Sequence, residues 1–190
     1  MVILNSRIAN QLEDARNNFA TCRQICDFLM ENNTAPISAE IVMRGHARTV
    51  HIPSEKCGLF TTPFIHNTML DIRRSLDFFG LKCMDGKIQP FKPRDNDYWM
   101  GSVNLSSVSP DELDEIFIRT CGISAFESLE EILTYSNKQL AHFTTSKFKE
   151  DNRMLLHLRN CSIVFFEAIE LFIYDRLEIP PRPLRISVDP

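Results

Sequence analysis

"CSIVFFEAIELFIYDRL", residues 161–177, is the most apolar stretch of this 190-residue chain. Four charged residues interrupt it, too many for a membrane span. A helix formed by these residues is apolar around most of its circumference, which is typical of the central helix of a bundle. We therefore predict a last helix from about Asp151 to Leu177, buried on most sides around Phe165, Ile169 and Phe172.

Helical periodicity continues upstream of this central helix. The first helix is predicted from apolar residues that step by four and three along nearly seven turns, at Ile8, Leu12, Ala15, Phe19, Cys22, Cys26 and Leu29. A second helix is predicted from Pro63 to Gly80, because glycine suits the position just past a helix end. Capping boxes that begin at Ser109 and Ser124 predict a short helix ending near Gly122 and a longer one ending near Phe143.

The remaining segments are not helical in pattern. Residues 39–43 and 48–52 are β-prone around a polar turn, which predicts a hairpin. Asp85-Gly86 predicts a turn, and the charged, proline-containing residues 89–97 predict a loop. Three prolines at 180, 181 and 183 predict an extended tail over 178–190.

The chain is accordingly predicted to be a single, mainly α domain over residues 1–190. Its fold is a helical bundle of four long helices plus short helices, with a small β-hairpin excursion over about residues 39–52.

Composition narrows the class of protein. The formal net charge of −4 gives no bulk attraction to nucleic acid or to an anionic membrane. The amino-terminal residues turn polar after four positions, so they lack the apolar core of a signal peptide. Six cysteines occur singly and mostly among apolar neighbours, which is typical of reduced core residues. We expect a cytoplasmic protein with no membrane partner.

A candidate polar cluster joins the second helix, the charged loop and the fourth helix. Its members lie off the apolar stripes and need polar partners: His66, Arg73, Asp77, Asp97, Asn137, Lys138 and His142. Two interpretations remain open. The cluster pins the loop across the bundle, or it binds a small anion or nucleotide phosphate through Arg73, Lys138 and a protonated His142.

A second polar line runs along the last helix at Arg153, His157, Asn160 and Glu167. Arg153 and His157, the first two residues of this line, come soon after Lys138 and His142 in the chain. The polar face of the last helix is therefore expected to oppose that of the helix before it. They form either a hydrogen-bonded seam between antiparallel helices or a shallow site lined by Lys138, His142, Arg153 and His157.

Three short motifs resemble those of a group of uncharacterised bacterial helical proteins. They are "RRSLDFF" at 73–79, "RDNDYW" at 94–99 and "NKQLAH" at 137–142, and the resemblance covers roughly residues 64–145. It implies a helical fold without a known activity.

The chain is also distantly similar to the HEPN superfamily of helical bundles, which includes dimeric, metal-independent ribonucleases and nucleotide-binding modules. The nucleases of that superfamily use an arginine and a histidine separated by four to six residues. Arg153 and His157 have three residues between them, and Arg44 and His51 have six but lie in the hairpin region. The resemblance makes Arg153 and His157 the alternative catalytic pair.

Metal and cofactor signals are weaker. His46, His51 and Cys57, with Cys83 as a conceivable fourth ligand, form an alternative zinc set without the usual paired spacing. Cys22 and Cys26 are interpreted as core packing. No glycine-rich phosphate loop occurs in the sequence, and we predict no cofactor.

These observations favour a non-catalytic, self-associating interaction module. Ile25 and Phe28 widen the apolar surface of the first helix beyond one stripe, which is expected to be buried in a homodimer. The alternative is a HEPN-like ribonuclease, which would bind RNA, or a nucleotide- or anion-binding protein.

Overall fold

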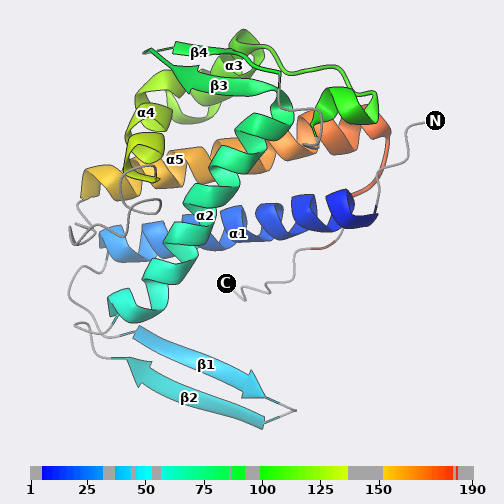
Figure 1. The fold of residues 1–190 in the computed structure, drawn as a ribbon. Coiled ribbons are helices and arrows are strands. Elements are labelled where there is room, and N and C mark those ends of the chain that lie inside the picture. Colours follow the sequence, from blue (N-terminus) through cyan, green and yellow to red (C-terminus); the bar gives the residue numbers. More distant parts are fainter. Residues whose placement is uncertain are drawn as a thin grey trace.

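The structure is a computed structural model that describes residues 6–31, 37–43, 46–52, 57–85, 87–92, 99–136, 152–181 and 183. It is mainly α-helical, as predicted, with long helices crossing one another and two small antiparallel hairpins (Figure 1). In chain order the elements are α1 (Ser6–Glu31), β1 (Ile37–Met43), β2 (His46–Ile52), α2 (Cys57–Phe79), β3 (Leu81–Met84), β4 (Lys87–Pro90), the 3-10 helix η2 (Met100–Val103), α3 (Pro110–Cys121), α4 (Ala125–Tyr135), α5 (Asn152–Ile169) and the π-helix η4 (Glu170–Asp175).

The central position predicted for the last helix is confirmed. α5 packs against α1, α2, α3 and α4, and it continues into η4 (Figure 1). Phe165, Ile169 and Phe172 are all buried in the core. The apolar circumference of this helix therefore reflects neighbours on most of its sides.

Four phenylalanines join three helices at the centre of the core. The ring of Phe79 in α2 stacks on Phe165 of α5, with centroids 6.1 Å apart, and meets Phe172 edge-on at 5.9 Å. Phe19 of α1 lies 5.9 Å from Phe165. Since Phe79 touches two of these rings, it holds α2 against the α5–η4 helix.

α1 buries its whole predicted stripe and runs antiparallel to α5. Arg16, near its start, pairs with Glu170 beyond the end of α5, whereas Asp27, near its end, pairs with Arg159. The neighbouring Ile25 and Phe28 are partly buried against the core.

α2 begins earlier than predicted. It starts at Cys57, and Pro63 lies inside the helix. A proline inside a helix lacks the N–H that would donate to the carbonyl four residues back, and its ring clashes with that carbonyl. α2 is nevertheless helical on both sides of Pro63. The predicted end is confirmed, because Gly80 has a left-handed φ of 77° and its N–H donates to the Asp77 carbonyl at 3.1 Å.

The two predicted capping boxes have different outcomes. At α3, the Glu112 N–H donates to Ser109 Oγ at 3.2 Å and the Ser109 N–H donates to Glu112 Oε2 at 2.7 Å. The latter bond holds the pKa of the Glu112 carboxyl below its usual value. At α4 the prediction is wrong, because Ser124 makes no side-chain cap. Asp114 of α3 instead accepts the Ala125 N–H at 2.6 Å.

Asp114→Ala should therefore destabilise the protein by about 1 kcal/mol, the usual effect of removing a helix cap. Ser124→Ala is the matched control and should change the free energy of unfolding by no more than a few tenths of a kcal/mol. Urea denaturation of both variants measures the difference. A larger loss for Ser124→Ala than for Asp114→Ala would show that the local serine caps α4 after all.

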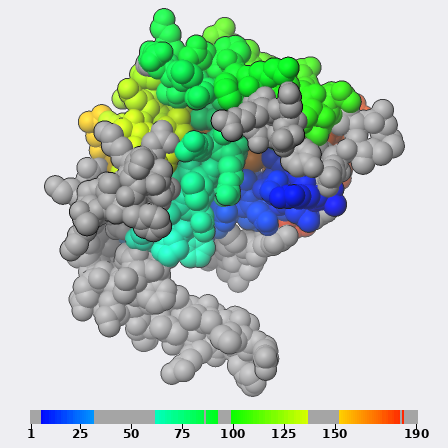
Figure 2. Space-filling view, viewed as in Figure 1, coloured from blue at the N-terminus to red at the C-terminus, as the bar shows by residue number. Residues whose placement is uncertain are grey.

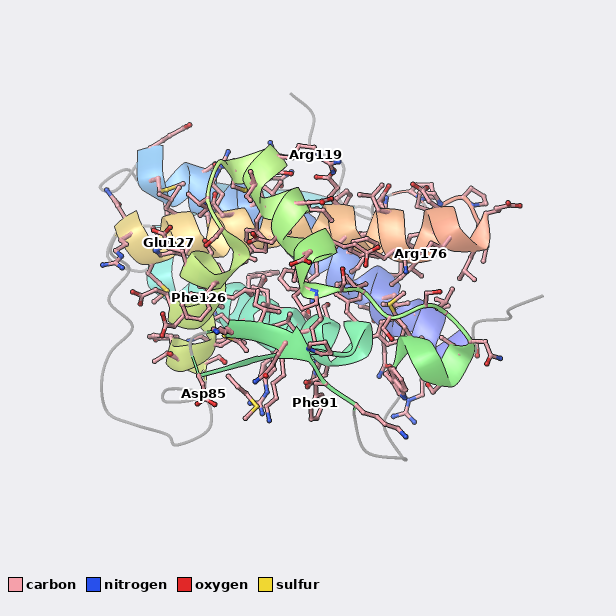
Figure 3. The ribbon with its side chains drawn as sticks, turned by 90° about the horizontal axis from the view of Figure 1, so that it is seen from above. Asp85, Phe91, Arg119, Phe126, Glu127 and Arg176 are labelled. Carbon is pink, nitrogen blue, oxygen red and sulfur yellow. The ribbon has the colours of Figure 1, made fainter. Side chains whose placement is uncertain are left out.

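α3 is fastened to the α5–η4 helix by two arginines at opposite ends (Figure 3). Arg119 pairs with Glu167, and Thr120 Oγ1 donates to the same carboxylate at 3.0 Å. Arg176 donates to Glu112 Oε1 and to the Ser106 carbonyl, both at 2.9 Å.

The predicted hairpin is confirmed as β1 paired with β2, from Ile37 opposite Ile52 to Met43 opposite His46. A second hairpin, β3–β4, was not predicted. It places residues 89 and 90 of the predicted loop in β4, and its two-residue Asp85-Gly86 connection is a strong hairpin signal.

In the predicted extended tail, residues 178–181 and 183 form neither helix nor strand, which agrees with the prolines there.

α4 is described as far as Ser136, so its predicted continuation to Phe143 lies outside the described residues.

Among the described helices, none has the length and apolarity that crossing a membrane requires.

Candidate functional site

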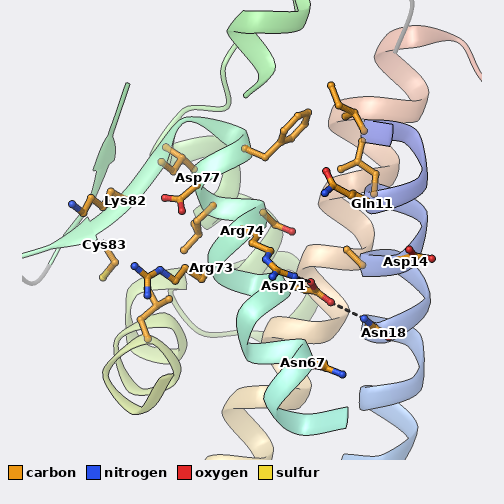
Figure 4. Close-up of a pocket in the computed structure, with 18 of the residues that line it drawn as sticks. Gln11, Asp14, Asn18, Asn67, Asp71, Arg73, Arg74, Asp77, Lys82 and Cys83 are labelled. Atoms are coloured by element: carbon orange, nitrogen blue, oxygen red, sulfur yellow. Dashed lines mark hydrogen bonds and ion pairs between the residues drawn. The ribbon is translucent and has the colours of Figure 1, made fainter. Parts of the chain in front are cut away.

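A cleft of about 670 Å³ lies between α1, α2 and β3 (Figure 4). α1 and α2 both reach the surface on the face seen in Figure 2, where their blue and teal atoms adjoin. The apolar floor of the cleft comes from the stripes that build the core: Ile8, Leu12, Ala15 and Leu76. Because the apolar stripe of each helix faces the core and forms the floor, the polar residues beside each stripe lie along the walls of the cleft.

The walls follow the two helices for a considerable length. On α1 the lining runs from Ile8 to Asn18, which is about 15 Å along a helix axis, nearly three turns. On α2 it runs from Asn67 to Phe78, a similar distance. Gln11 and Asn67 are exposed on the two walls, so the cleft is open to solvent along its length.

Among the residues that the structure describes, charges of both signs line the cleft in equal number. The carboxylates are Asp14, Asp71 and Asp77, and the cations are Arg73, Arg74 and Lys82. Across the α1–α2 part of the cleft, Asn18 Nδ2 donates to Asp71 Oδ2 at 2.7 Å, and Arg74 lies 3.3 Å from Asp71 Oδ1 (Figure 4). The lining thus combines an apolar floor with walls whose formal charges cancel.

The part of the cleft toward β3 carries a separate pair of cations. Figure 4 shows Arg73, Lys82 and Cys83 on the side of α2 that is turned away from α1. The Lys82 ammonium lies 5.0 Å from the centroid of the Phe91 ring. Burial, with the nearby carboxylate of Glu130 as a smaller cause, raises the pKa of the Cys83 thiol, which keeps it protonated.

The predicted polar cluster coincides with this cleft in part. Arg73 and Asp77 both line it. His66 lies two turns before Arg73 on the same helix and is half-buried, and its burial lowers the pKa of the imidazole. Asp97, Asn137, Lys138 and His142 lie outside the described residues. Asp14, Asn18, Arg74 and Lys82 were not predicted.

Arg153 and His157 take part in a seam between α4 and α5. His157 is only 6% exposed, and its Nδ1 lies 3.1 Å from Ser128 Oγ of α4. Arg153 donates to Glu131 Oε1 at 2.8 Å and lies 3.5 Å from His157 Nε2. These contacts agree with the interpretation of the polar line as a hydrogen-bonded seam between antiparallel helices.

The alternative zinc set falls on side chains that the structure does not describe: those of His46, His51 and Cys57. Within the described part of the chain, no group of three or more histidine, cysteine or acidic side chains is placed to hold a metal ion.

Cys22 and Cys26 are core residues, as predicted. Both are fully buried, with their sulfur atoms 3.9 Å apart. The pKa of the Cys26 thiol is raised by its hydrogen bond with Cys22 and by burial, and burial likewise raises that of Cys161. The raised pKa values mean that neither Cys26 nor Cys161 is activated as a nucleophile.

A buried ionic network was not predicted from the sequence. Arg16, 6% exposed, lies 3.4 Å from the carboxylate of Glu13, which is 2% exposed, and 2.6 Å from Glu170. Tyr174 Oη donates to Glu13 Oε2 at 2.9 Å, and the Arg16 guanidinium lies 5.0 Å from the centroid of the Phe166 ring. Two members of the network, Glu170 and Tyr174, come from the π-helix η4.

One signal of this network was present in the sequence. Arg16 lies one turn after Leu12 and one turn before Phe19, so it borders the apolar stripe of α1 rather than the opposite, solvated face. A charged residue in that position requires a partner, but the spacing alone does not identify a glutamate far along the chain.

Comparison with family models, with curated proteins and with solved structures finds no match to this chain. The two resemblances carried by short motifs therefore stay predictions, and the function must be argued from the site itself.

Proposed function

We propose that the protein is a non-catalytic interaction module that binds a polypeptide segment of a partner in the cleft and also self-associates as a homodimer. The observation that carries the proposal is the lining of the cleft, an apolar floor between two long walls that bear charges of both signs. Polypeptide segments present the same combination of apolar and oppositely charged side chains.

The dimensions support a segment of chain as the ligand. A wall of about 15 Å is the length of nearly three helical turns or about five extended residues. Amphipathic helices bind by laying an apolar face into a groove of this kind, with polar contacts along the rims. Gln11 and Asp14 on one rim, with Arg74 on the other, are exposed and able to make such contacts.

The charge pattern favours a polypeptide over a polyanion. Nucleic acids and anionic surfaces are bound chiefly by excess positive charge. In the cleft, Arg73, Arg74 and Lys82 are balanced by Asp14, Asp71 and Asp77, and the whole chain has a formal net charge of −4. A ligand with charges of both signs is complementary to both sets.

Blocking the cleft tests the proposal. Random dodecapeptides displayed on phage are selected on the full chain, and the enriched peptides are synthesised and measured by fluorescence anisotropy. Gln11→Trp, which fills the mouth of the cleft from α1, should weaken binding by about tenfold or more, or at least 1.4 kcal/mol. Gln24→Trp is the matched control, since Gln24 is an exposed glutamine of the same helix outside the cleft.

A second matched pair tests the part of the cleft toward β3. Lys82 and Lys87 are both exposed lysines of the β3–β4 hairpin, and only Lys82 lines the cleft. Lys82→Glu should change peptide affinity, and Lys87→Glu should not. Enriched peptides that bind all four variants as they bind the wild type would rule out the cleft as the binding surface.

Binding of a small anion is the second candidate function, favoured by the position of two cations, Arg73 and Lys82, on the same β3 side of α2. Inorganic phosphate and ATP are the probes. Thermal stabilisation by either one, lost in Arg73→Ala and kept in Lys87→Ala, would favour this candidate. Cleavage of single-stranded RNA without metal, abolished by Arg153→Ala or His157→Ala, would instead favour the HEPN-like nuclease.

The proposal includes a cytoplasmic location. It is supported by the burial of Cys22, Cys26 and Cys161 as free thiols, which suits a reducing compartment.

A further inference from the structure

The β1–β2 hairpin is a sheet without a third strand. Within the described ranges, β1 pairs with β2 alone, and neither strand packs extensively against another described element. Figure 1 shows the hairpin beyond the amino-terminal end of α2, away from the helices. Both outer edges of this small sheet are therefore available for backbone pairing.

An isolated two-stranded sheet is only marginally stable in water. Three or more strands, or a helix packed on one face, are generally needed for a stable arrangement. Each strand here has seven residues, long enough to offer a row of backbone N–H and C=O groups to another strand. A further strand from another chain would supply what the described part of this chain does not.

The two edges differ in how well their sequences prevent pairing. Natural sheets protect exposed edges with charged residues, especially basic ones. β2, "HARTVHI", contains Arg48 and two histidines, whereas β1, "ISAEIVM", contains a single charged residue, Glu40. The edge formed by β1 is therefore the one open to a neighbour.

We propose that β1 pairs with β1 of a second copy of this chain, antiparallel and about a two-fold axis, to form a continuous four-stranded sheet in the order β2–β1–β1–β2. This inference rests on the proposed self-association and gives it a surface that is separate from the cleft. A second copy fits because a two-fold interface needs one surface that is complementary to itself, and a mostly apolar strand meets that condition.

The charges also select a register. A two-fold axis perpendicular to the sheet passes midway between the two copies of one residue of β1, because paired residues must lie on the same face. Centring on Glu40 would place two carboxylates directly opposite, which is destabilising. Centring on Ile41 instead sets Glu40 opposite Val42 and Ala39 opposite Met43, so every direct pair contains an apolar residue. The register centred on Ile41 is the one we assign.

The backbone alternation agrees with this choice. Met43 and His46 flank a two-residue connection, which predicts that they form a hydrogen-bonded pair. Every second residue of β1, from Met43 back to Ile37, is then also expected to direct its backbone N–H and C=O groups toward β2. Ser38, Glu40 and Val42 then have their backbone groups at the free edge. Pairing Glu40 with Val42 of the second copy uses these groups.

A charge placed on one strand or the other tests the inference. Val42 and Ala47 are direct partners in the β1–β2 register, so glutamate at either position adds the same charge to the same face of the hairpin. By sedimentation velocity at tens of micromolar, the wild type and Ala47→Glu should be dimeric. Val42→Glu places a carboxylate directly opposite Glu40 of the second copy, so it should raise the dimer dissociation constant at least about tenfold, or 1.4 kcal/mol.

Cross-linking checks the register. Ile41→Cys should form an inter-chain disulfide under mild oxidation, since facing residues of a non-hydrogen-bonded pair have Cα atoms about 4.5 Å apart. Thr49→Cys in β2 and the wild type, with its native cysteines, should not. A dimer that Val42→Glu leaves intact would overturn the hairpin interface while self-association stands. A monomeric wild type would overturn both, and neither result bears on the cleft, which is tested separately by peptide binding to Gln11→Trp.

Discussion

Arg16→Met should destabilise the protein by about 3–5 kcal/mol, the usual cost of removing one partner from a buried ion pair. Glu13 would keep its carboxylate at 2% exposure without the guanidinium 3.4 Å away, and Glu170 would lose its 2.6 Å contact. The Tyr174 hydroxyl would still donate to Glu13, but one neutral donor does not compensate a buried charge. Urea denaturation followed by circular dichroism gives the free energy of unfolding.

The matched control is Arg23→Met on the same helix. Arg23 is 54% exposed and lies 3.9 Å from Asp27, so its loss should cost less than about 1 kcal/mol. Adding Glu13→Gln to Arg16→Met should recover part of the stability, since the buried group is then neutral. If Arg16→Met cost no more than Arg23→Met, the network would not contribute to folding as its burial implies.

The sequence predicted those parts of the fold that depend on local pattern. The stripe from Ile8 to Leu29 and the apolar run after Cys161 repeat at helical spacing, so their burial follows from periodicity alone. The Ser109 box was predictable because both of its hydrogen bonds join residues three apart. Local chemistry was sufficient for each of these elements.

The parts that the sequence missed depend on contacts between distant residues. The amino-terminal end of α4 is capped not by the predicted Ser124 but by Asp114, eleven residues before Ala125, which only the crossing of α3 and α4 brings near. Arg16 and Glu170 are 154 residues apart, and no spacing rule predicts their meeting. The β3–β4 hairpin is different, because its Asp-Gly turn was recognised and only the pairing of its short flanks was missed.

The candidate site shows the same division. Arg73 and Asp77 were predicted as polar residues beside a stripe, and they line the cleft. Their neighbours Asp14, Asn18 and Lys82 come from α1 and β3, and no periodicity indicates which elements will pack beside α2. A sequence can therefore indicate that a polar flank needs a partner, while the identity of that partner follows from the packing of the helices.

The aromatic centre of the core is expected to be as sensitive as the ionic network. Phe79→Ala should cost about 3–5 kcal/mol, because it removes a fully buried ring and leaves a cavity between α2 and α5. The lost ring contacts Phe165 at 6.1 Å and Phe172 at 5.9 Å, so two aromatic pairs disappear with it. The change is measured by urea denaturation.

Phe64→Ala makes the same substitution near the other end of α2, at a side chain that is 47% exposed. It should cost less than about 1 kcal/mol, since no comparable cavity forms and much of the ring already contacts solvent. Phe79→Leu should fall between the two, because leucine fills most of the volume but provides no ring to stack. Equal losses for Phe79→Ala and Phe64→Ala would mean that the contact of α2 with α5 is not a determinant of stability. The position of α2, and with it one wall of the cleft, would then have to be fixed by other contacts, such as the bond from Asn18 to Asp71 at 2.7 Å.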